Sequence, residues 1–354
     1  MKALVAMSGG VDSSVAAALM LEAGHEVIGV TLKQWVAPDG SLPTAGCCTV
    51  ADAEDARKVA ARLGIPHYVL DHSAEFTAEV VDRFVAGYAA GLTPNPCIEC
   101  NRRVRFGALL GRVEPLGCDV LVTGHYARIA MRHGRRALLQ AADPTKDQSY
   151  VLHMLSAADL ARVRFPVGEL TKAEVRDHAA RLGLGTAAKP DSQDLCFVAG
   201  DYRAFLRSRL PEIRRPGAVV DASGAVVGHH DGIAGFTVGQ RRGLGMAAGE
   251  PRYVVAVDSA TATVRVGSRS DLAVAACTVA GVRFVNEAAA AGEPVAVKVR
   301  YRSRPVPARL FPVADAWRVV FDAAQEAVAP GQAAVFYRDD EVLGGGTITA
   351  TEAP

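Results

Sequence analysis

The sequence predicts an α/β domain built on a parallel sheet, followed by a small central β-rich domain and a C-terminal antiparallel β-barrel. Three features support this prediction: short β-branched runs alternate with helical patterns in the first part, the helical patterns stop near Pro211, and longer strands begin near Leu272. The predicted domains cover residues 1–210, 211–271 and 272–354. A chain of 354 residues, 50% of them hydrophobic, can bury a sizeable core.

The first domain is expected to alternate strands and helices, which is the pattern of βαβ units around a parallel sheet. Strands are expected at residues 2–6, 25–32, 67–70 and 120–123. Helices are expected at residues 13–23, 51–63, 74–90, 105–112, 148–155, 172–182 and 202–210. A hairpin over residues 127–139 is expected to turn at His133 and Gly134.

The two later domains are expected to consist of short strands divided by Gly, Pro and Asp. In the central domain, strands are expected at residues 218–221, 226–229, 253–258 and 264–266. In the last domain, they are expected at residues 295–301, 308–312, 317–321 and 333–338. Turns recur there about every 8 to 12 residues, which is typical of a small barrel or sandwich.

The chain is almost neutral, with 39 Lys and Arg against 38 Asp and Glu and a formal charge of +1. This balance excludes a broadly polybasic protein but allows a local basic face. No uninterrupted apolar stretch of about 18 residues is present, and the first seven residues run into a glycine turn, so a cytoplasmic protein without a membrane partner is expected. Seven cysteines, an odd number, argue against a structural disulfide framework.

Residues 7–14, Met-Ser-Gly-Gly-Val-Asp-Ser-Ser, lie between the first expected strand and an alanine-rich helix. The two glycines allow a tight turn and close approach of a ligand, and the serine hydroxyls lie beside the exposed amides of a helix N-terminus. This arrangement suits an anion. Asp12 would repel a bare phosphate, so it predicts a magnesium ion between its carboxylate and a pyrophosphate group.

A lone Gly-Gly would fit a capped strand-to-helix turn equally well, but the complete Ser-Gly-Gly-x-Asp-Ser-Ser string is more specific. It lacks the lysine of a P-loop and the spacing of a dinucleotide fingerprint. It resembles the PP-loop of the ATP pyrophosphatase superfamily, whose members cleave ATP between the α and β phosphates and adenylate a substrate oxygen. The resemblance implies ATP binding by Ala6, Met7, Ser8, Gly9, Gly10, Val11, Asp12 and Ser13.

Two further positions are expected to form the walls of the adenine site, because ligands of open α/β sheets lie at the carboxyl ends of strands. Leu32 ends the second expected strand, and Gly124 follows the strand at residues 120–123. Each is also an ordinary structural position. The prediction depends on both strand ends meeting near one loop.

Cys97 and Cys100 lie in the segment 93–101, Thr-Pro-Asn-Pro-Cys-Ile-Glu-Cys-Asn. Its two prolines fix φ and are expected to discourage a helix before the second cysteine. Cys100 is the candidate nucleophile, because the arginines that follow it favour a thiolate below the free-cysteine pKa of about 8.5. Those arginines are Arg102, Arg103 and Arg105.

Cys196 is the second candidate, in a polar loop over residues 189–196 that is expected to end in a short apolar strand. Alone, it would be interpreted as a buried strand cysteine. A zinc site on Cys97 and Cys100 lacks the second ligand pair that would complete it. An iron-sulfur site on Cys97, Cys100 and Cys196 stays open but is not favoured.

Several further motifs accompany the PP-loop and residues 93–101. They are residues 123–128 (Thr-Gly-His-Tyr-Ala-Arg), 146–149 (Lys-Asp-Gln-Ser), 191–197 (Asp-Ser-Gln-Asp-Leu-Cys-Phe), 236–245 and 330–337. In their order and spacing, these motifs resemble those of the bacterial tRNA-specific 2-thiouridylases, the MnmA/TrmU family, and the resemblance covers almost the whole chain.

This resemblance implies an ATP-dependent tRNA sulfurtransferase that thiolates C2 of the wobble uridine in the anticodon loop, with sulfur from a relay protein or a cysteine desulfurase. ATP would adenylate the C2 oxygen, Cys196 would carry a persulfide, and Cys100 would attack it to free sulfur or close a disulfide with it. The order is chemically reasonable, because AMP is a good leaving group and a persulfide is a reactive sulfur donor. The resemblance also implies tRNA contacts from Asn95, Pro96, Cys97, His125, Lys146, Asp147, Gln148, Arg300, Tyr301 and Gln332.

One position departs from the family, because many members carry Asp where this chain has Cys97, at a position proposed for acid-base assistance. Cys97 could supply a thiol, join a cluster, or leave the role to Asp12 or water.

Two other functions compete with thiolation. One is a PP-loop enzyme that adenylates a small molecule and is indifferent to Cys196, and the other is an RNA-binding protein without ATP turnover.

Overall fold

The structure is a computed structural model that describes residues 1–36, 49–191, 195–198, 200–210, 214–244 and 250–354. Three predicted features lie outside these residues: residues 192–194 of the motif before Cys196, Gly245, and the boundary residue Pro211. The described chain divides into two compact units. The first holds Met1–Val81, Pro96–Ala199 and Asp340–Val342, and the second holds Asp82–Asn95, Gly200–Asp339 and Leu343–Pro354.

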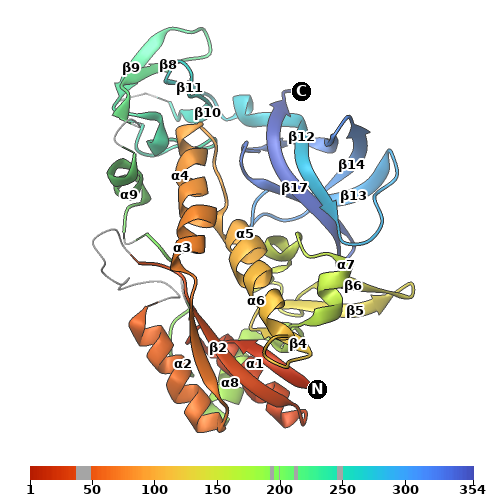
Figure 1. Cartoon of the computed structure of the whole chain (residues 1–354). Helices are drawn as coiled ribbons and strands as arrows, with labels where there is room; N and C mark the ends of the chain where they lie inside the picture. The colour runs from red at the N-terminus through yellow and green to blue at the C-terminus, as the bar shows by residue number, and fades with distance from the viewer. Residues whose placement is uncertain (37–48, 192–194, 199, 211–213, 245–249) are drawn as a thin grey trace. The chain divides into compact units, whose positions relative to one another are not determined.

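A parallel sheet forms the centre of the first unit, with the strand order β3-β2-β1-β4-β7 (Figure 1). The strands are β1 (Lys2–Ala6), β2 (Glu26–Lys33), β3 (His67–Asp71), β4 (Val120–Thr123) and β7 (Val163–Arg164). The chain adds β2 and then β3 on one side of β1, and it then crosses to the other side of β1, where β4 and β7 follow. The carboxyl ends of β1 and β4 therefore flank a switch point, where ligands of such sheets bind. The predicted parallel sheet is confirmed.

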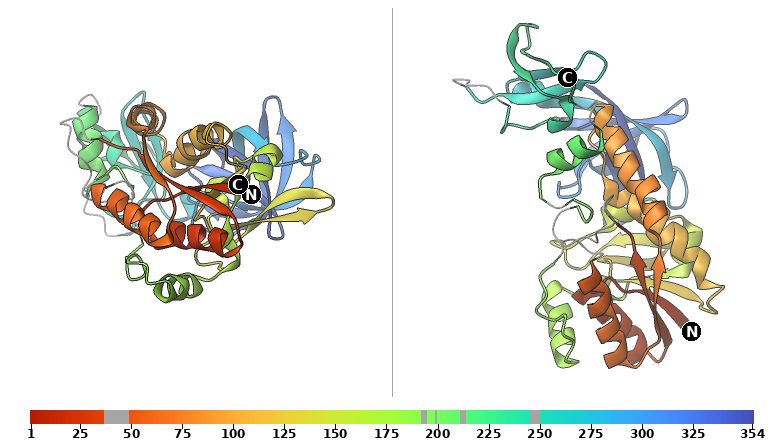
Figure 2. Two further views of the ribbon diagram at one scale, coloured as in Figure 1. Left: turned by 60° about the horizontal axis from the view of Figure 1, so that its bottom comes forward. Right: turned by 60° about the vertical axis from the view of Figure 1, so that its left-hand side comes forward.

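Three helices pack on one face of this sheet, as Figures 1 and 2 show: α1 (Val11–Glu22), α2 (Val50–Leu63) and α8 (Lys172–Arg181). Alanines along α1 let the helix lie close to the strands, and Ala16 and Ala17 are fully buried against Val5 and Val122. This packing fixes the start of α1 next to the end of β1.

The segment from Pro96 to Val113 is helical throughout, which corrects the prediction that the prolines discourage a helix before Cys100. Its parts are α5 (Pro96–Glu99), the π-helical η2 (Cys100–Arg105) and α6 (Phe106–Val113). Pro96 is the first residue of α5, where a proline loses no helical hydrogen bond and its fixed φ suits the helix.

The other helical parts of the first unit are α3 (Ser73–Phe76), the π-helical η1 (Thr77–Val81), the 3-10 turns η3 (Ser149–Leu152) and η4 (Pro166–Glu169), and α7 (Ala157–Arg162). The predicted helix over residues 148–155 is wrong beyond one 3-10 turn. The side chain of Asp147 accepts from the backbone nitrogen and the hydroxyl of Ser149, and these local bonds hold a turn instead of a longer helix.

The predicted hairpin is present as β5 (Ala127–Arg132) and β6 (Arg135–Gln140), with His133 and Gly134 both at positive φ in the turn. No strand follows Cys196 among the described residues. Val198 instead donates to the carbonyl of Leu195 in a turn, so the predicted short strand is wrong there.

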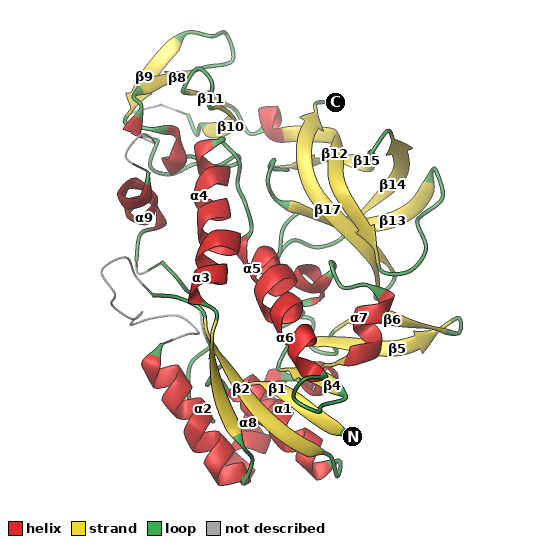
Figure 3. Cartoon of the chain, viewed as in Figure 1, coloured by secondary structure: helices red, strands yellow, loops and turns green. Residues whose placement is uncertain are grey.

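The second unit contains α4 (Asp82–Ala89), α9 (Tyr202–Arg209), the turns η6 (Ile233–Gly235) and η7 (Ser270–Leu272), and two β structures (Figure 3). The smaller β structure has the order β10-β11-β8-β9. Its strands are β8 (Gly217–Val220), β9 (Val226–His230), β10 (Tyr253–Asp258) and β11 (Thr263–Gly267), close to the predicted ones.

The larger β structure is the predicted antiparallel barrel, closed by pairing of β12 with both β15 and β17. Its strands are β12 (Ala273–Phe284), β13 (Glu293–Lys298), β14 (Val306–Val313), β15 (Ala316–Glu326), β16 (Ala333–Arg338) and β17 (Glu341–Glu352). The strand predicted to reach residue 301 ends at Lys298, because the chain turns where Ser303 donates its backbone nitrogen and hydroxyl to the carbonyl of Arg300. No helix of the described residues is long and apolar enough to span a membrane.

Candidate active site

The PP-loop segment, residues 7–14, joins the end of β1 to the start of α1. Gly9 has φ of +71°, and a Cβ at this position would lie 2.1 Å from the backbone oxygen of Asp52, so no other residue fits without a backbone shift. The hydroxyl of Ser13 lies 3.1 Å from the backbone nitrogen of Ser8 and 3.1 Å from the carbonyl of Gly10. These contacts hold the loop in a tight turn over the N-terminus of α1, which suits an anion.

The two predicted walls of the nucleotide site flank this loop. A Cβ on Gly124 would lie 2.6 Å from the backbone nitrogen of Ser13, so the end of β4 approaches the loop more closely than a side chain allows. Leu32 is buried near the end of β2, on the other side of β1. The switch point therefore brings both predicted strand ends to one edge of the sheet, and contact of either residue with adenine stays a prediction.

Asp12 is held by two side chains that no sequence motif had linked to it. Lys172 donates to both of its carboxylate oxygens, at 2.7 and 2.9 Å, and the Tyr126 hydroxyl donates at 2.7 Å. Burial, together with the charge of Asp12, raises the pKa of Tyr126 far above its ordinary value, so the phenol stays a donor. One acceptor position of the four or so on the carboxylate remains.

A magnesium ion fits this remaining position of Asp12 if the nucleotide supplies most of its ligands, as magnesium sites on phosphates usually do. Among the described residues, no three His, Cys, Asp or Glu side chains group around a common metal position. Cys97, Cys100 and Cys196 are all described and form no such group.

Cys100 is buried and begins the π-helical turn η2. Its sulfur receives a hydrogen bond from Gln34 Nε2 at 3.5 Å, and Gln34 lies one residue beyond the end of β2. The nucleophile predicted from the sequence is therefore tied to the same edge of the sheet as the predicted adenine wall at Leu32.

Cys196 is half-buried in a turn, and its neighbour Phe197 anchors that turn. The Phe197 ring lies 6.2 Å from the Trp35 ring and 5.8 Å from the Phe76 ring, both edge-on. Trp35 directly follows Gln34, which bonds Cys100. Two consecutive residues just after β2 thus contact Cys100 and the neighbour of Cys196, although the two cysteines are 96 positions apart in the sequence.

Cys97 is exposed on the first turn of α5, three positions before Cys100. Pro96, beside it, is buried. The neighbouring Asn95 belongs to the second unit, as do Arg300, Tyr301 and Gln332. In that unit, Gln332 Nε2 donates to the carbonyl of Thr93 at 2.7 Å, two residues before Asn95.

The predicted tRNA-contacting loop is attached to the PP-loop edge by its side chains. Gln148 Oε1 accepts from the backbone nitrogen of Tyr126, and Lys146 Nζ lies 2.8 Å from Asp191. Asp147 is buried and accepts from the backbone nitrogens of Ala141 and Ser149, so its carboxylate orders the loop.

His125 is buried and lies 2.7 Å, through Nδ1, from the hydroxyl of Thr123. Its ring also packs against Phe106 and Phe165. Burial lowers its pKa to about 3, so the imidazole is neutral at physiological pH. Its contact with RNA stays a prediction.

Three charged residues of this site had no predicted role: Lys172, Lys189 and Asp191. Lys189 Nζ donates to the carbonyl of Gly9 at 3.0 Å and to Asp52 and Asp55 at 2.7 Å each, which ties the PP-loop backbone to α2. The sequence contains one indication of a role for Lys172. A lysine at the first position of a helix is electrostatically unfavourable because of the helix dipole, so its presence indicates a role outside the helix.

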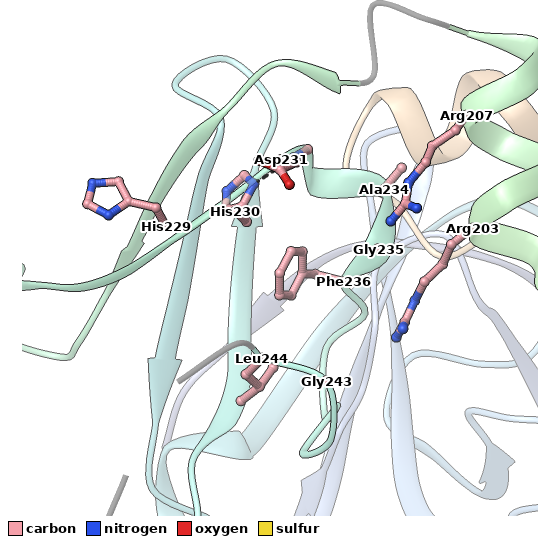
Figure 4. Close-up of a pocket in the computed structure, with 11 residues that line it drawn as sticks. Arg203, Arg207, His229, His230, Asp231, Ala234, Gly235, Phe236, Gly243 and Leu244 are labelled. Atoms are coloured by element: carbon pink, nitrogen blue, oxygen red, sulfur yellow. Dashed lines mark hydrogen bonds between the residues drawn. The ribbon is translucent and has the colours of Figure 1, made fainter. Parts of the chain in front are cut away.

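A separate pocket of about 200 Å³ lies in the second unit, and Figure 4 shows it. Arg203 and Arg207 extend from α9 toward the segment Ala234–Phe236, while His229 points away from it. None of the residues predicted to bind ATP or tRNA lines this pocket. Part of the 236–245 motif does, through Phe236, Gly243 and Leu244.

Three family descriptions match consecutive parts of the chain. Residues 1–200 match "tRNA methyl transferase HUP domain", residues 203–268 match "tRNA methyl transferase PRC-barrel domain", and residues 274–348 match "Aminomethyltransferase beta-barrel domain". Among solved structures, a 4-thiouridine synthetase in complex with RNA and ATP is 21% identical with a TM-score of 0.37, over 60% of this chain and 50% of that one. That likeness is too distant to bear on the site.

Relatives of similar length match almost the whole chain. The tRNA-specific 2-thiouridylase MnmA of Chloroflexus aurantiacus is 51% identical over 99% of this chain and 98% of its own. The protein of the same name from Mycolicibacterium paratuberculosis is 50% identical over 99% of both chains. With this identity over its full length, the chain belongs to the MnmA family of tRNA-specific 2-thiouridylases.

Proposed function

We propose that the protein is a tRNA-uridine 2-sulfurtransferase that uses ATP to activate C2 of the wobble uridine and a cysteine persulfide to replace its oxygen. The observation that carries the proposal is that Gln34, directly after β2, bonds Cys100, while the next residue, Trp35, packs against Phe197 of the Cys196 turn. β2 pairs with β1, and the end of β1 leads into the PP-loop. An anion site and two cysteines associated with neighbouring strand ends suit an activation step followed by sulfur transfer. The same function is that of the family to which the chain belongs.

In the first step, the C2 oxygen attacks the α phosphate of ATP and releases pyrophosphate, which leaves an adenylated uridine. The PP-loop amides and the hydroxyls of Ser8 and Ser13 would hold the phosphates, and Ala6, Val11, Leu32 and Gly124 would complete the nucleotide site. A magnesium ion, held in part by Asp12, would neutralise phosphate charge. Adenylation turns a poor leaving group into AMP.

In the second step, Cys196 carries a persulfide, Cys196-S-SH, made with sulfur from a relay protein or a cysteine desulfurase. The Cys100 thiolate attacks the Cys196 sulfur and breaks the S-S bond, which releases hydrosulfide and forms a Cys100-Cys196 disulfide. Hydrosulfide adds to C2 and expels AMP. A dithiol reductant must then return two electrons to the disulfide before another turnover.

The tRNA anticodon loop is the proposed substrate, because a single-stranded loop can splay one base into a pocket at low cost. Asn95, Pro96 and Cys97 are proposed to meet that base. His125, Lys146, Asp147, Gln148, Arg300, Tyr301 and Gln332 are proposed as further RNA contacts. A protein that acts on tRNA is proposed to work in the cytoplasm.

Incubation of the protein with ATP, magnesium, a persulfide donor and an unmodified tRNA transcript tests this function. Nucleoside mass spectrometry is expected to find 2-thiouridine, with AMP formed alongside. Cys100→Ser and Cys196→Ser are each expected to abolish the product, while Cys118→Ser, a change at a cysteine away from the site, is the matched control. Full activity of both site variants would exclude the relay.

Iron analysis separates the persulfide relay from a mechanism with an iron-sulfur cluster. The relay predicts that protein purified without oxygen is active and contains no iron. Visible absorption and iron in proportion to activity, lost together in Cys97→Ser, would instead place a cluster on the three cysteines.

A further inference from the structure

A cluster of charged side chains next to the PP-loop has no assigned role beyond Asp12 and Lys146. Asp191 is its centre, with the nitrogens of three cations near its carboxylate: Lys172 at 2.7 Å, Lys146 at 2.8 Å and Arg176 at 3.2 Å. Lys172 is shared, because the same Nζ also lies 2.7 Å from Asp12. A single ammonium group therefore connects the PP-loop carboxylate with Asp191.

Lys172 is the least exposed member, with 12% of its side chain accessible, against 29% for Asp191 and 35% for Lys146. Charges removed from water interact more strongly than exposed ones. A change in the charge around Asp191 therefore alters how strongly Lys172 binds Asp12, because Lys172 makes a short contact with each carboxylate.

Asp191 is also where three functional segments meet. It lies five residues before Cys196, its partner Lys146 belongs to the loop proposed to contact tRNA, and its partner Lys172 holds the PP-loop through Asp12. Arg176 contacts the same Oδ1 of Asp191 as Lys172 does, and its guanidinium also donates to the carbonyls of Ala187 and Lys189 in the chain just before Asp191. The carboxylate is thus fixed in place while two lysines bind it from different segments.

An RNA phosphate is a strong competitor for a lysine bound to a carboxylate. If a tRNA phosphate draws Lys146 away, Asp191 loses one of its three cations and attracts Lys172 more strongly. Lys172 then shifts from Asp12 toward Asp191. Asp12 keeps its hydrogen bond from Tyr126 and offers more of its carboxylate to the magnesium and nucleotide that the proposed function assigns to it.

We propose that Asp191 is a positioning residue that, through Lys146 and Lys172, makes ATP binding and cleavage at the PP-loop depend on bound tRNA. The inference rests on the proposed function, because it presumes that both ligands bind this chain. It assigns Asp191 no contact with substrate. As a consequence of this coupling, the enzyme cleaves ATP only when a uridine is present to be adenylated.

Thermodynamic coupling between the ligands tests the inference without relying on turnover. The affinity of the α,β-methylene analogue of ATP is measured by calorimetry with and without an unmodified tRNA transcript. Wild type is expected to bind the analogue about fivefold or more tightly with tRNA, and by reciprocity to bind tRNA more tightly by the same factor with the analogue. In Asp191→Asn, the factor is expected to fall to about one.

Three variants make the result specific. Lys146→Gln is expected to lose the coupling as well, and it answers the question if Asp191→Asn does not fold. Asp191→Glu keeps the charge and is expected to restore most of the coupling. Asp71→Asn is the matched control, because Asp71 forms an ion pair with Lys33 at the same 2.8 Å as the pair of Asp191 with Lys146, but at an exposed position.

A wild-type factor near one, or a wild-type factor retained in both Asp191→Asn and Lys146→Gln, would overturn the inference. The proposed function fails by a different result, the absence of 2-thiouridine when wild-type protein is supplied with ATP, a persulfide donor and tRNA. The two failures are therefore distinguishable in one set of preparations.

Discussion

Gly124 shows at the scale of one residue how the fold restricts the nucleotide site. A Cβ at this position would lie 2.6 Å from the backbone nitrogen of Ser13 and 2.7 Å from the carbonyl carbon of Asp12, and neither backbone atom can move without distorting the PP-loop. The role of the glycine is therefore steric. The sequence places Gly124 after a strand, but the approach of Ser13 depends on how β1 and β4 pair.

Gly124→Ala is expected to weaken ATP binding by about tenfold or more, because a displaced loop loses its fit to the phosphates and tenfold corresponds to about 1.4 kcal/mol. Calorimetric titration with the α,β-methylene analogue of ATP measures it. The control is Gly111→Ala in α6, where an added Cβ meets nothing within 4 Å. Unchanged affinity in Gly124→Ala would contradict the close approach.

Two buried histidines predict how stability depends on pH. Desolvation lowers the pKa of His125 to about 3 and that of His153 to about 4, below the ordinary 6.5. The unfolded chain therefore binds more protons than the folded chain below pH 6.5, so stability present above that pH is lost as the pH falls toward 4. Between its folded and its unfolded pKa, each histidine contributes a slope that approaches about 1.4 kcal/mol per pH unit.

His153→Gln is expected to reduce the loss of stability between pH 6.5 and 4.5, because glutamine does not titrate. Urea denaturation of the full chain at several pH values measures the free energy of unfolding of variant and wild type. The carboxylates titrate alike in both proteins, so their contribution cancels in the difference between the two free energies. Parallel curves for the two proteins would show that His153 is not held neutral.

At the scale of elements, the anchoring of the PP-loop depends on a residue far away in the sequence. Lys189 donates to the carbonyl of Gly9 and to two carboxylates of α2, Asp52 and Asp55. Burial lowers the pKa of Lys189, but the hydrogen bonds to both carboxylates raise it, with a net rise, so the ammonium group stays charged. One side chain thus ties three segments together.

Lys189→Met is expected to raise the ATP concentration needed for half-maximal AMP formation several-fold, because the loop loses a backbone anchor and two carboxylates are left near the phosphates. Steady-state kinetics with saturating tRNA measures this. Lys33→Met removes a lysine from the exposed pair with Asp71 and is the control, expected to leave the ATP dependence unchanged. Equal behaviour of the two variants would mean that the Lys189 contacts do not support the loop.

Local patterns predicted most elements, and the errors have physical causes. The parallel strands and the later antiparallel ones follow from hydrophobic periodicity and turn residues, which act over a few positions. The expectation that proline breaks helices does not predict the helix before Cys100, because Pro96 occupies the first position of that helix. The pattern over residues 148–155 predicts a longer helix than forms, because the Asp147 side chain competes with helical bonding there.

At the scale of the whole molecule, the sequence could not show which distant side chains meet. Asp12 and Lys172 are 160 positions apart, and Lys189 and Gly9 are 180 positions apart. Barrel closure also joins positions that are far apart in the sequence, since β12 and β17 pair through residues such as Cys277 and Thr351. Motifs identified the PP-loop and the two cysteines, whereas the lysines that hold the PP-loop and the bond from Gln34 to Cys100 emerge only from the folded chain.

The division into units also differs from a simple run of domains along the sequence. Asp82–Asn95 lies with the second unit although both flanking segments lie with the first, and Asp340–Val342 lies with the first unit at the start of β17. Strand pairing explains the second case, because Glu341 and Val342 pair with Leu139 and Leu138 of β6. The three-domain boundaries drawn from the sequence stay a prediction.

Nucleoside mass spectrometry of tRNA from cells that lack this protein tests the central claim most directly. The predicted result is loss of the 2-thiouridine derivative at the wobble position, restored by a plasmid with the wild-type chain but not by Cys100→Ser or Cys196→Ser. An unchanged level of wobble 2-thiouridine in the deleted cells, or full restoration by both cysteine variants, would contradict the account.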